Sequence, residues 1–344
     1  MAHTPDPIAD TPTATDQHTA PDATSRRWLL RGAAAGVAAI GTAALLHPSA
    51  AIAAPDNTAP GTHGGGSAGR VPRDRISVQL YTLRDQLGIN LESSLAELRH
   101  IGYTHVEHAG FVGRTAAQFR TALDNAGLKA TSGHVGIPQP FDAAAWEAAL
   151  ADANTIGNRY IVNPLFGLDF STFQPIRDAA RYHAFAKDLN RAGAIAKRAG
   201  ISLGYHNHHL EFIRQTGPGS AGGTRTGFDI ITAETDPALV HLEVDLYWAW
   251  RGTADPVDLI HANRGRIRQV HVKDVTVDTS FTTAPFADAG QGVIDFGRIF
   301  QHAREAGIEE FIIERDDAGS PPRTPADALS TARVGYQYLS GLTF

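Results

Sequence analysis

The 344-residue sequence contains no cysteine. This absence excludes disulfide bonds, zinc sites built from thiolates and a cysteine nucleophile. Basic residues are also in short supply, because 30 Lys and Arg face 36 Asp and Glu and leave a net charge of −6. A nucleic-acid partner favours a basic surface and is therefore not expected. The apolar run at residues 32–46 is rich in Ala and Gly and falls short of the ~20 residues that a membrane-spanning helix needs, so no stable membrane span is expected.

The N-terminus carries the pattern of an export signal. Arg26 and Arg27 precede the apolar run, and Ala51-Ile52-Ala53 follows it as an A-x-A cleavage site. Residues 1–54 are therefore predicted to be a twin-arginine signal peptide, which would make the mature protein extracellular, periplasmic or bound at the cell surface. Residues 55–74 are rich in Gly, Ser, Pro and Thr and predict a flexible linker. The folded domain is predicted to span residues 75–344 and to need nothing before Ile76.

From Ile76 onward one unit recurs: an apolar strand, a polar loop, an amphipathic helix and a glycine. Strands are predicted near residues 76, 103, 128, 159, 201, 240, 267 and 308, each followed by helical sequence, the last at residues 325–338. This alternation predicts an α/β protein with a parallel sheet, and eight units favour a single (β/α)8 TIM barrel. A doubly wound sheet is the alternative, but no Gly-x-Gly-x-x-Gly follows the first strand. The long loops at 164–180, 209–228 and 275–294 all follow strands and are expected to be walls or lids at the mouth; the second is predicted to be a hairpin.

Alternate residues of a strand face opposite ways, so each predicted strand can be divided into an apolar face and a polar one. The polar faces collect a set of inward side chains at the strand ends. Buried polar groups are costly unless they are paired, so a set of this size predicts a ligand site, although any single member could be a satisfied structural hydrogen bond. The set comprises Gln79, Tyr81, Glu107, His134, Asn163, His206, His208, Glu243, Asp245, His271, Lys273 and Glu314.

Four members of this set are predicted to bind one divalent metal ion: His206, Asp245, His271 and Glu314. Two imidazoles and two carboxylates without a thiolate suit Mn, Co, Mg or Zn, and the pattern does not choose among them. Lys273 lies on the face of His271 and is expected either to hold a substrate oxygen or to form an ion pair with Glu243 or Asp245. Trp248 and Trp250 are expected to line the pocket or to belong to the core.

The chain from Ile76 to its end resembles the sugar phosphate isomerase/epimerase group of xylose isomerase-like TIM barrels. The segments that carry the resemblance are SVQLYTLRD, GYTHVEHAG, GYHNHHLEF, EVDLYWAWRG, HVKDV, GQGVIDF and IIERD. The resemblance implies a metal held by Glu, Asp, His and Glu from the fifth to the eighth strands. Asp245, His271 and Glu314 match the last three. The fifth strand departs from the pattern, because Gly204 stands at the aligned position and His206 is the next inward residue.

The resemblance implies a divalent-metal-dependent isomerase or epimerase that removes a proton next to the carbonyl of a sugar or keto-sugar. A lyase acting on 3-keto-glycosides and a catalytically silent sugar-binding barrel are the alternatives. The expected partner is a small carbohydrate. Catalytic roles are predicted for Glu314, His134, His208 and Lys273, and Glu107 is a further candidate base. Substrate contacts are predicted for Gln79, Tyr81, Glu107, Asn163, Glu243 and Trp248.

Overall fold

Eight parallel strands lie where the sequence predicts them. The structure, a computed structural model, describes residues 69–276 and 285–344, so the predicted signal peptide and most of the predicted linker fall outside the described residues. The strands are β1 (Ile76–Val78), β2 (His105–His108), β3 (Lys129–Gly133), β4 (Tyr160–Asn163), β7 (Ser202–His206), β8 (Val240–Asp245), β9 (Ile267–Val272) and β12 (Glu310–Ile313).

The strands close into a ring in sequence order. Six form one sheet in the order β1-β12-β9-β8-β7-β4, and β2 pairs with β3. Two parallel bridges join these parts, one between Gln79 and Glu107 and one between His134 and Val162. The predicted TIM barrel is confirmed, and both bridging pairs include residues of the predicted site.

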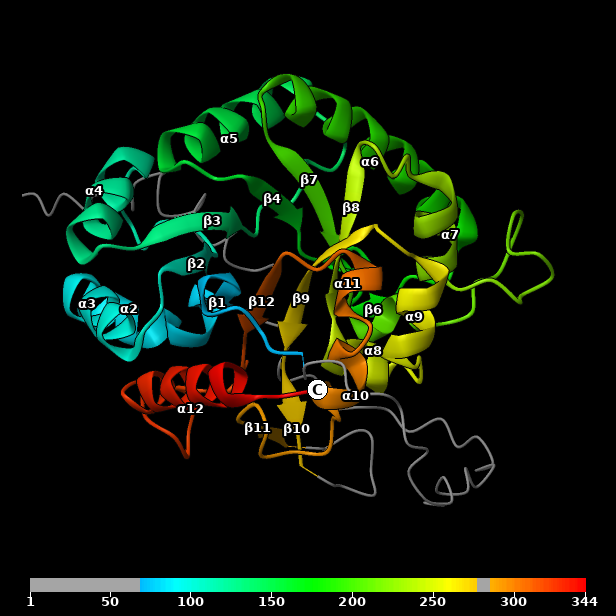
Figure 1. The fold of residues 1–344 in the computed structure, drawn as a ribbon. Helices are drawn as coiled ribbons and strands as arrows, with labels where there is room; N and C mark the ends of the chain where they lie inside the picture. Colours follow the sequence, from blue (N-terminus) through cyan, green and yellow to red (C-terminus); the bar gives the residue numbers. More distant parts are fainter. Residues whose placement is uncertain (1–68, 277–284) are drawn as a thin grey trace, which may run out of the picture.

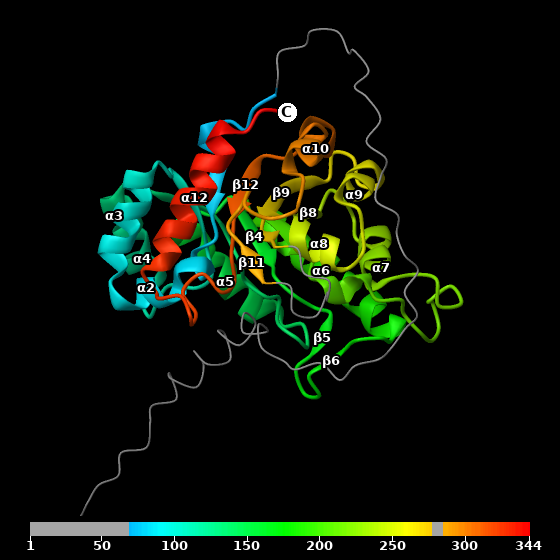
Figure 2. The same ribbon diagram turned by 90° about the horizontal axis from the view of Figure 1, so that it is seen from below.

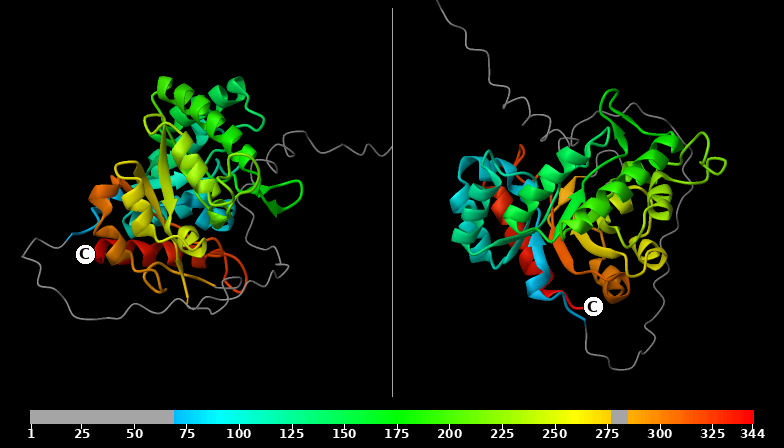
Figure 3. Two further views of the ribbon diagram at one scale, coloured as in Figure 1. Left: turned by 90° about the vertical axis from the view of Figure 1, so that its right-hand side faces the viewer. Right: turned by 90° about the horizontal axis from the view of Figure 1, so that it is seen from above.

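Helices surround the strands (Figures 1 and 3). They are α2 (Arg84–Ile89), α3 (Leu91–Ile101), α4 (Ala116–Ala126), α5 (Ala143–Ile156), α6 (Ala179–Arg198), α7 (Gly227–Glu234), α8 (Leu246–Arg251), α9 (Pro256–Ala262), α10 (Phe296–Phe300), α11 (Ala303–Ala306) and α12 (Asp327–Gly341). In α3 a stripe of Leu91, Leu95 and Leu98 is buried in the core. α4 begins with a capping box at Thr115 and ends at Gly127, whose φ of 71° favours glycine.

The barrel begins earlier than the composition predicts. Gly69 and Phe344 exchange two backbone hydrogen bonds, at 2.6 and 3.1 Å, and Arg70 forms a bridge with Thr343. Val71 is 3% exposed and belongs to the core. The end of the predicted linker therefore pairs with the C-terminus and packs on the barrel, while independence of the fold from residues before Ile76 stays a prediction.

The long loops carry structure of their own. Residues 164–180 include the antiparallel pair β5 (Leu168–Asp169) and β6 (Gln174–Pro175), which stands out from the barrel in Figure 2. In the second loop a 3₁₀ helix, η4 (His209–Phe212), precedes an antiparallel bridge between Arg214 and Thr226, so the predicted hairpin is present. In the third, β10 (Asp274–Val275) pairs with β11 (Phe286–Ala287), and residues 277–284 lie outside the described part. Within residues 69–276 and 285–344, no helix combines the length and the apolarity needed to cross a membrane.

Candidate metal centre and active site

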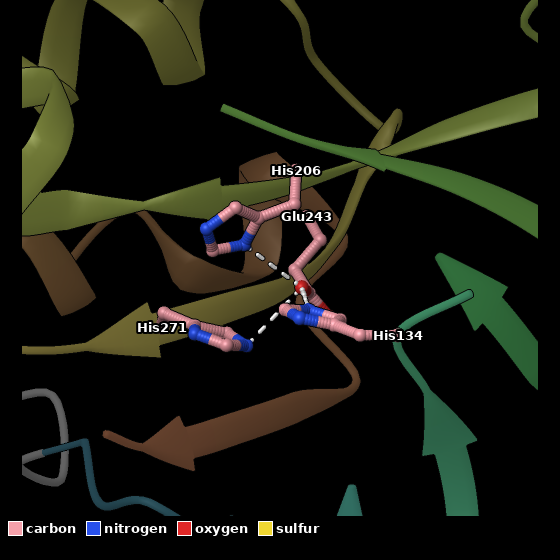
Figure 4. A group of neighbouring side chains, drawn as sticks. All are labelled: His134, His206, Glu243 and His271. Atoms are coloured by element: carbon pink, nitrogen blue, oxygen red, sulfur yellow. Dashed lines mark hydrogen bonds and ion pairs between the residues drawn. The ribbon is translucent and has the colours of Figure 1, made fainter. Parts of the chain in front are cut away.

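Three histidines and a glutamate converge inside the barrel at the ends of β3, β7, β8 and β9 (Figure 4). The Oε1 atom of Glu243 lies 2.7 Å from His134 Nε2, 3.0 Å from His206 Nδ1 and 3.1 Å from His271 Nε2. The rings of His134 and His271 are stacked, with centroids 5.2 Å apart. Burial raises the pKa of Glu243, but His271 and His134 outweigh it and hold that pKa well below its ordinary value. The carboxylate is therefore ionised and fixes the imidazoles.

Glu107 is a second carboxylate in this layer. Its Oε1 lies 2.8 Å from His271 Nε2 and 3.3 Å from His134 Nε2. Its oxygens also accept hydrogen bonds from Gln79 Nε2 at 2.8 Å and from Ser132 Oγ at 2.6 Å. Burial and the neighbouring Glu243 raise the pKa of Glu107. The three histidines of this cluster, here called the histidine layer, are thus held by two buried carboxylates, Glu107 and Glu243.

A second group lies beside the first and shares His271 with it. The ligand atoms of Asp245, His271 and Glu314 all fall within 4.8 Å of one another. His271 Nδ1 is 2.7 Å from Glu314 Oε2 and 4.0 Å from Asp245 Oδ2. His206 Nε2 is 3.9 Å from the same Asp245 atom. The structure therefore brings Asp245, His271 and Glu314 together as predicted and places His206 between the two groups.

Together with His206, the residues of this second group fit a divalent metal ion. Each histidine offers it one ring nitrogen, Nε2 in His206 and Nδ1 in His271, while the opposite nitrogen meets Glu243 or Glu107. A carboxylate behind a ligating histidine is the usual way in which proteins fix the ring for a metal. Among the described residues, the buried Asp245 Oδ2 accepts no hydrogen bond, and the Lys273 ammonium lies 3.3 Å from it as an ion pair. Burial and His271 lower the pKa of His206 to about 3, so its ring is neutral, as a ligand must be.

Lys273 is a buried cation that lies beside this second group. Its Nζ lies 2.9 Å from Glu314 Oε2, 3.1 Å from Asp316 Oδ1 and 3.3 Å from Asp245 Oδ2. Burial lowers the pKa of Lys273, but the three carboxylates, Asp245 first, outweigh it and raise that pKa well above its ordinary value. Of the expected ion pairs the structure shows the one with Asp245 and does not show one with Glu243.

Aromatic rings line one side of this cluster. Trp248 is 9% exposed, and its ring centroid lies 5.1 Å from that of His208 and 5.0 Å from that of His209. Lys273 Nζ lies 5.2 Å from the Trp248 ring centroid. In the part of the chain that the structure describes, neither His208 Nδ1 nor Trp248 Nε1 has a hydrogen-bond partner although both atoms are buried. Buried donors and acceptors are generally paired, so these two atoms point to a polar ligand.

Several residues with predicted substrate contacts have protein partners. Gln79, Glu107 and Glu243 are fully buried. Gln79 donates a hydrogen bond to Glu107, while Glu107 contacts His271 and Glu243 contacts His134. Asn163 is 2% exposed, accepts a hydrogen bond from Ile137 N at 2.9 Å and donates one to Leu165 O at 3.1 Å. The polar groups of these four side chains therefore hold the strand ends together, except that Glu243 Oε2 has no hydrogen-bond partner among the described residues. The substrate contacts predicted for the four side chains stay predictions. Tyr81 remains a candidate, since it is half-buried near the mouth.

Sequence reasoning missed two features of the site. Asp316, a partner of Lys273, lies two residues beyond Glu314, and the same period of two that identified Glu314 could have found it. The second is the space in front of Gly204: a Cβ there would lie 2.6 Å from His241 Nε2. His241 in turn contacts Gln269 Oε1 at 2.9 Å. Glycine at this strand position therefore makes room for a neighbouring imidazole.

The closed barrel and the polar cluster at its strand ends define a TIM-barrel enzyme whose site can hold a metal ion. Residues 95–333 match the sequence pattern of the xylose isomerase-like TIM barrel family. The match spans more than half of the chain, and the protein belongs to that family.

Known proteins resemble this chain along most of its length. An inosose dehydratase from Geobacillus kaustophilus is 28% identical over 267 residues, which make up 67% of this chain and 82% of that protein. The crystal structure of a sugar phosphate isomerase/epimerase from Parabacteroides distasonis has a TM-score of 0.64 at 25% identity and covers 79% of this chain and 95% of its own. The structure of the protein named IOLI, which holds a zinc atom, has a TM-score of 0.56 at 15% identity over 77% of this chain and 99% of its own, which shows the fold alone.

Proposed function

We propose that this protein is a divalent-metal-dependent lyase that eliminates water or an alcohol from a keto-sugar or keto-cyclitol. The observation that carries the proposal is the chemistry of the fifth barrel strand. β7 and the two residues after it contain no Asp or Glu, and the position aligned with a ligand carboxylate is Gly204, whose free space the His241 ring takes up. Two-base epimerisation needs one carboxylate on each face of the substrate, and β7 does not supply its member of that pair. The similarity to an inosose dehydratase supports the same conclusion.

His206, Asp245, His271 and Glu314 would hold the metal ion. When bound, the ion would polarise the substrate carbonyl and stabilise the negative charge that develops on its oxygen. His271 bears a carboxylate at each ring nitrogen. Burial lowers the pKa of His271, but Glu243 and Glu314 outweigh it and raise that pKa well above its ordinary value, so metal binding must release a proton from this ring.

His208 is the base that the geometry favours. Its Nδ1 is buried beside Trp248 and, within the described residues, unpaired. The ring nitrogen of His134, in contrast, already lies 2.7 Å from Glu243. His208 would remove the proton next to the carbonyl, and the electron pair of that C–H bond would pass into the enolate. The enolate would then form a C=C bond as the β-oxygen leaves, and the imidazole would return the proton to that oxygen.

Lys273 and Trp248 would position the substrate. The ammonium group of Lys273 lies between Glu314 and Asp316 and presents a fixed positive charge to an oxygen that becomes negative. The Trp248 indole offers an apolar face to a sugar ring, and its buried N–H, which has no partner among residues 69–276 and 285–344, to a hydroxyl. These residues bind and orient, while His208 moves the proton.

Isomerisation or epimerisation is the second candidate. It is favoured by Glu314, which directly follows β12 and would act with His208, two residues beyond β7, as a mixed pair of bases. Similarity to the Parabacteroides distasonis protein supports it. We also propose that the protein is exported by the twin-arginine route, a proposal that rests on the N-terminal sequence alone.

Product analysis separates the two reactions. The metal-loaded protein is incubated in D2O with an inosose, a 3-keto-glycoside and an unphosphorylated ketose, and the products are followed by proton NMR. A lyase gives an unsaturated ketone together with water or the free alcohol, whereas an epimerase returns saturated sugar with deuterium at the inverted carbon. His208→Gln should abolish the elimination, while His209→Gln, which replaces the neighbouring ring on the same indole, should retain most of it. Deuterated epimer without unsaturated product would overturn the lyase assignment.

A further inference from the structure

A separate group of side chains of the types that ligate metals, two histidines and a glutamate, lies on the outside of the barrel. His261 is in the last turn of α9, His302 is the residue before α11, and Glu305 is inside α11. One ligand atom from each falls within 4.8 Å of the others. His261 Nδ1 is 3.0 Å from Glu305 Oε1, and His302 Nδ1 is 3.5 Å from Glu305 Oε2. The two imidazole centroids are 4.9 Å apart.

The fold holds these side chains in place. His302 and Glu305 are three residues apart and therefore share a face of α11, and the i,i+4 bond from Ala306 N to His302 O, at 2.9 Å, begins that helix. The α11 backbone is tied to the chain after α9 by a hydrogen bond from Gly265 N to Glu305 O at 3.0 Å. His261 thus meets two residues that lie more than forty positions further along the chain. The convergence comes from the barrel and is not a local feature of one helix.

We propose that His261, His302 and Glu305 form a second metal site, which binds one divalent transition ion such as Zn²⁺, Ni²⁺ or Cu²⁺. Two imidazoles and one carboxylate suit these ions, whereas Mg²⁺ and Ca²⁺ prefer oxygen ligands alone. The side chains are 40%, 30% and 28% exposed, so water can complete the coordination. The hydrogen bond from His261 lowers the pKa of Glu305, which keeps the carboxylate charged.

Arg264 is the group that opposes the ion. Its Nε contacts Glu305 Oε1, and its Nη2 lies 3.4 Å from His261 Nδ1. A bound cation would have to displace this guanidinium from the carboxylate. Removal of Arg264 should therefore tighten metal binding, whereas removal of any of the three ligands should abolish it.

The site would act on the stability of the barrel and not on catalysis. It joins α9 to α11, and the Gly265 bond that accompanies it stands just before β9, the strand that carries His271. An ion that binds only the folded chain stabilises it in proportion to its concentration above the dissociation constant. Ni²⁺ or Zn²⁺ is therefore expected to raise the melting temperature beyond the value reached when the central site alone is filled.

Calorimetric titration of the full-length protein tests the proposal in a His271→Ala background, because Mn²⁺ placed in the central site would be displaced by the more tightly binding Ni²⁺. With Ni²⁺ as the probe, we expect one ion per chain, loss of that binding when His261→Gln or Glu305→Gln is added, and tighter binding when Arg264→Gln is added. With His271 in place, turnover should be the same in all three surface variants. His100→Gln removes an exposed histidine of α3 and is the matched control, which should bind as the His271→Ala parent does.

Two results would overturn the second site: Ni²⁺ binding that survives Glu305→Gln, or no binding in the His271→Ala background with or without Arg264→Gln. Circular dichroism of each variant shows that it is folded. This Ni²⁺ titration uses no substrate, so its result does not depend on whether the protein is a lyase.

Discussion

Glu107 stands behind His271, with its Oε1 atom 2.8 Å from the ring Nε2. The other ring nitrogen faces Glu314 at 2.7 Å. Glu107 comes from β2 and His271 from β9, so the contact spans the barrel interior. The same arrangement recurs at His206, whose Nδ1 lies 3.0 Å from Glu243. The two carboxylates fix which nitrogen each histidine turns toward Asp245 and Glu314.

Glu107→Gln is expected to weaken metal binding while leaving all four ligands in place. Mutation of a carboxylate behind a ligating histidine typically costs about 10–100-fold in metal affinity. The measurement is a competition titration against a chromophoric chelator. A variant that binds metal as tightly as the wild type would show that Glu107 serves only to pack the barrel.

Gly204→Ala is expected to destabilise the protein. The new Cβ would lie 2.6 Å from His241 Nε2 and 3.0 Å from Val162 Cγ2. Overpacking of this kind costs about 1–3 kcal/mol of unfolding free energy. His241→Ala in the same chain should recover part of that loss, because it empties the occupied space. Urea denaturation of the two single variants and the double variant measures the coupling, and strictly additive effects would contradict the account.

Glu310→Gln is expected to change how stability depends on pH. Burial raises the pKa of Glu310 from 4.5 to about 7. Between these values the folded protein holds a proton that the unfolded chain releases, so this group's contribution is complete below about pH 4.5 and declines as pH rises through 7. The glutamine variant lacks this decline. It should match the wild type near pH 4.5 and exceed it in unfolding free energy at pH 8, and the opposite trend would refute the assignment.

Truncation at Arg73 is expected to lower the melting temperature relative to a chain that begins at Gly69. The shorter chain loses Val71, which is 3% exposed, and the pairing of Arg70 with Thr343. Burial of a valine side chain contributes about 1.5–3 kcal/mol. Differential scanning calorimetry of the two chains makes the comparison. Equal melting temperatures would restore the linker boundary that composition predicts.

Sequence periodicity predicted the barrel because each strand repeats one pattern, as Val270 and Val272 do opposite His271. It also predicted which side chains meet, since strand ends of a parallel barrel share one face. It could not assign layers: Glu107 and Asp245 both point inward, yet one supports a histidine and the other faces the predicted metal position. The depth of a side chain in the barrel depends on the register between strands. The same register places the His241 ring in the space beside Gly204. Local sequence does not encode register across strands.

Metal analysis of two variants shows whether the cluster inside the barrel binds a metal ion. Glu305→Gln removes the proposed surface site and leaves the central one, and Glu305→Gln/His271→Ala removes both. After purification in metal-supplemented buffer and dialysis, we expect elemental analysis to find one divalent ion per chain in the first variant and none in the second. Circular dichroism should show both barrels folded, since strand-end residues at this face carry function more than stability. A full complement of metal in the protein that carries His271→Ala would show that His271 and its neighbours do not hold the ion.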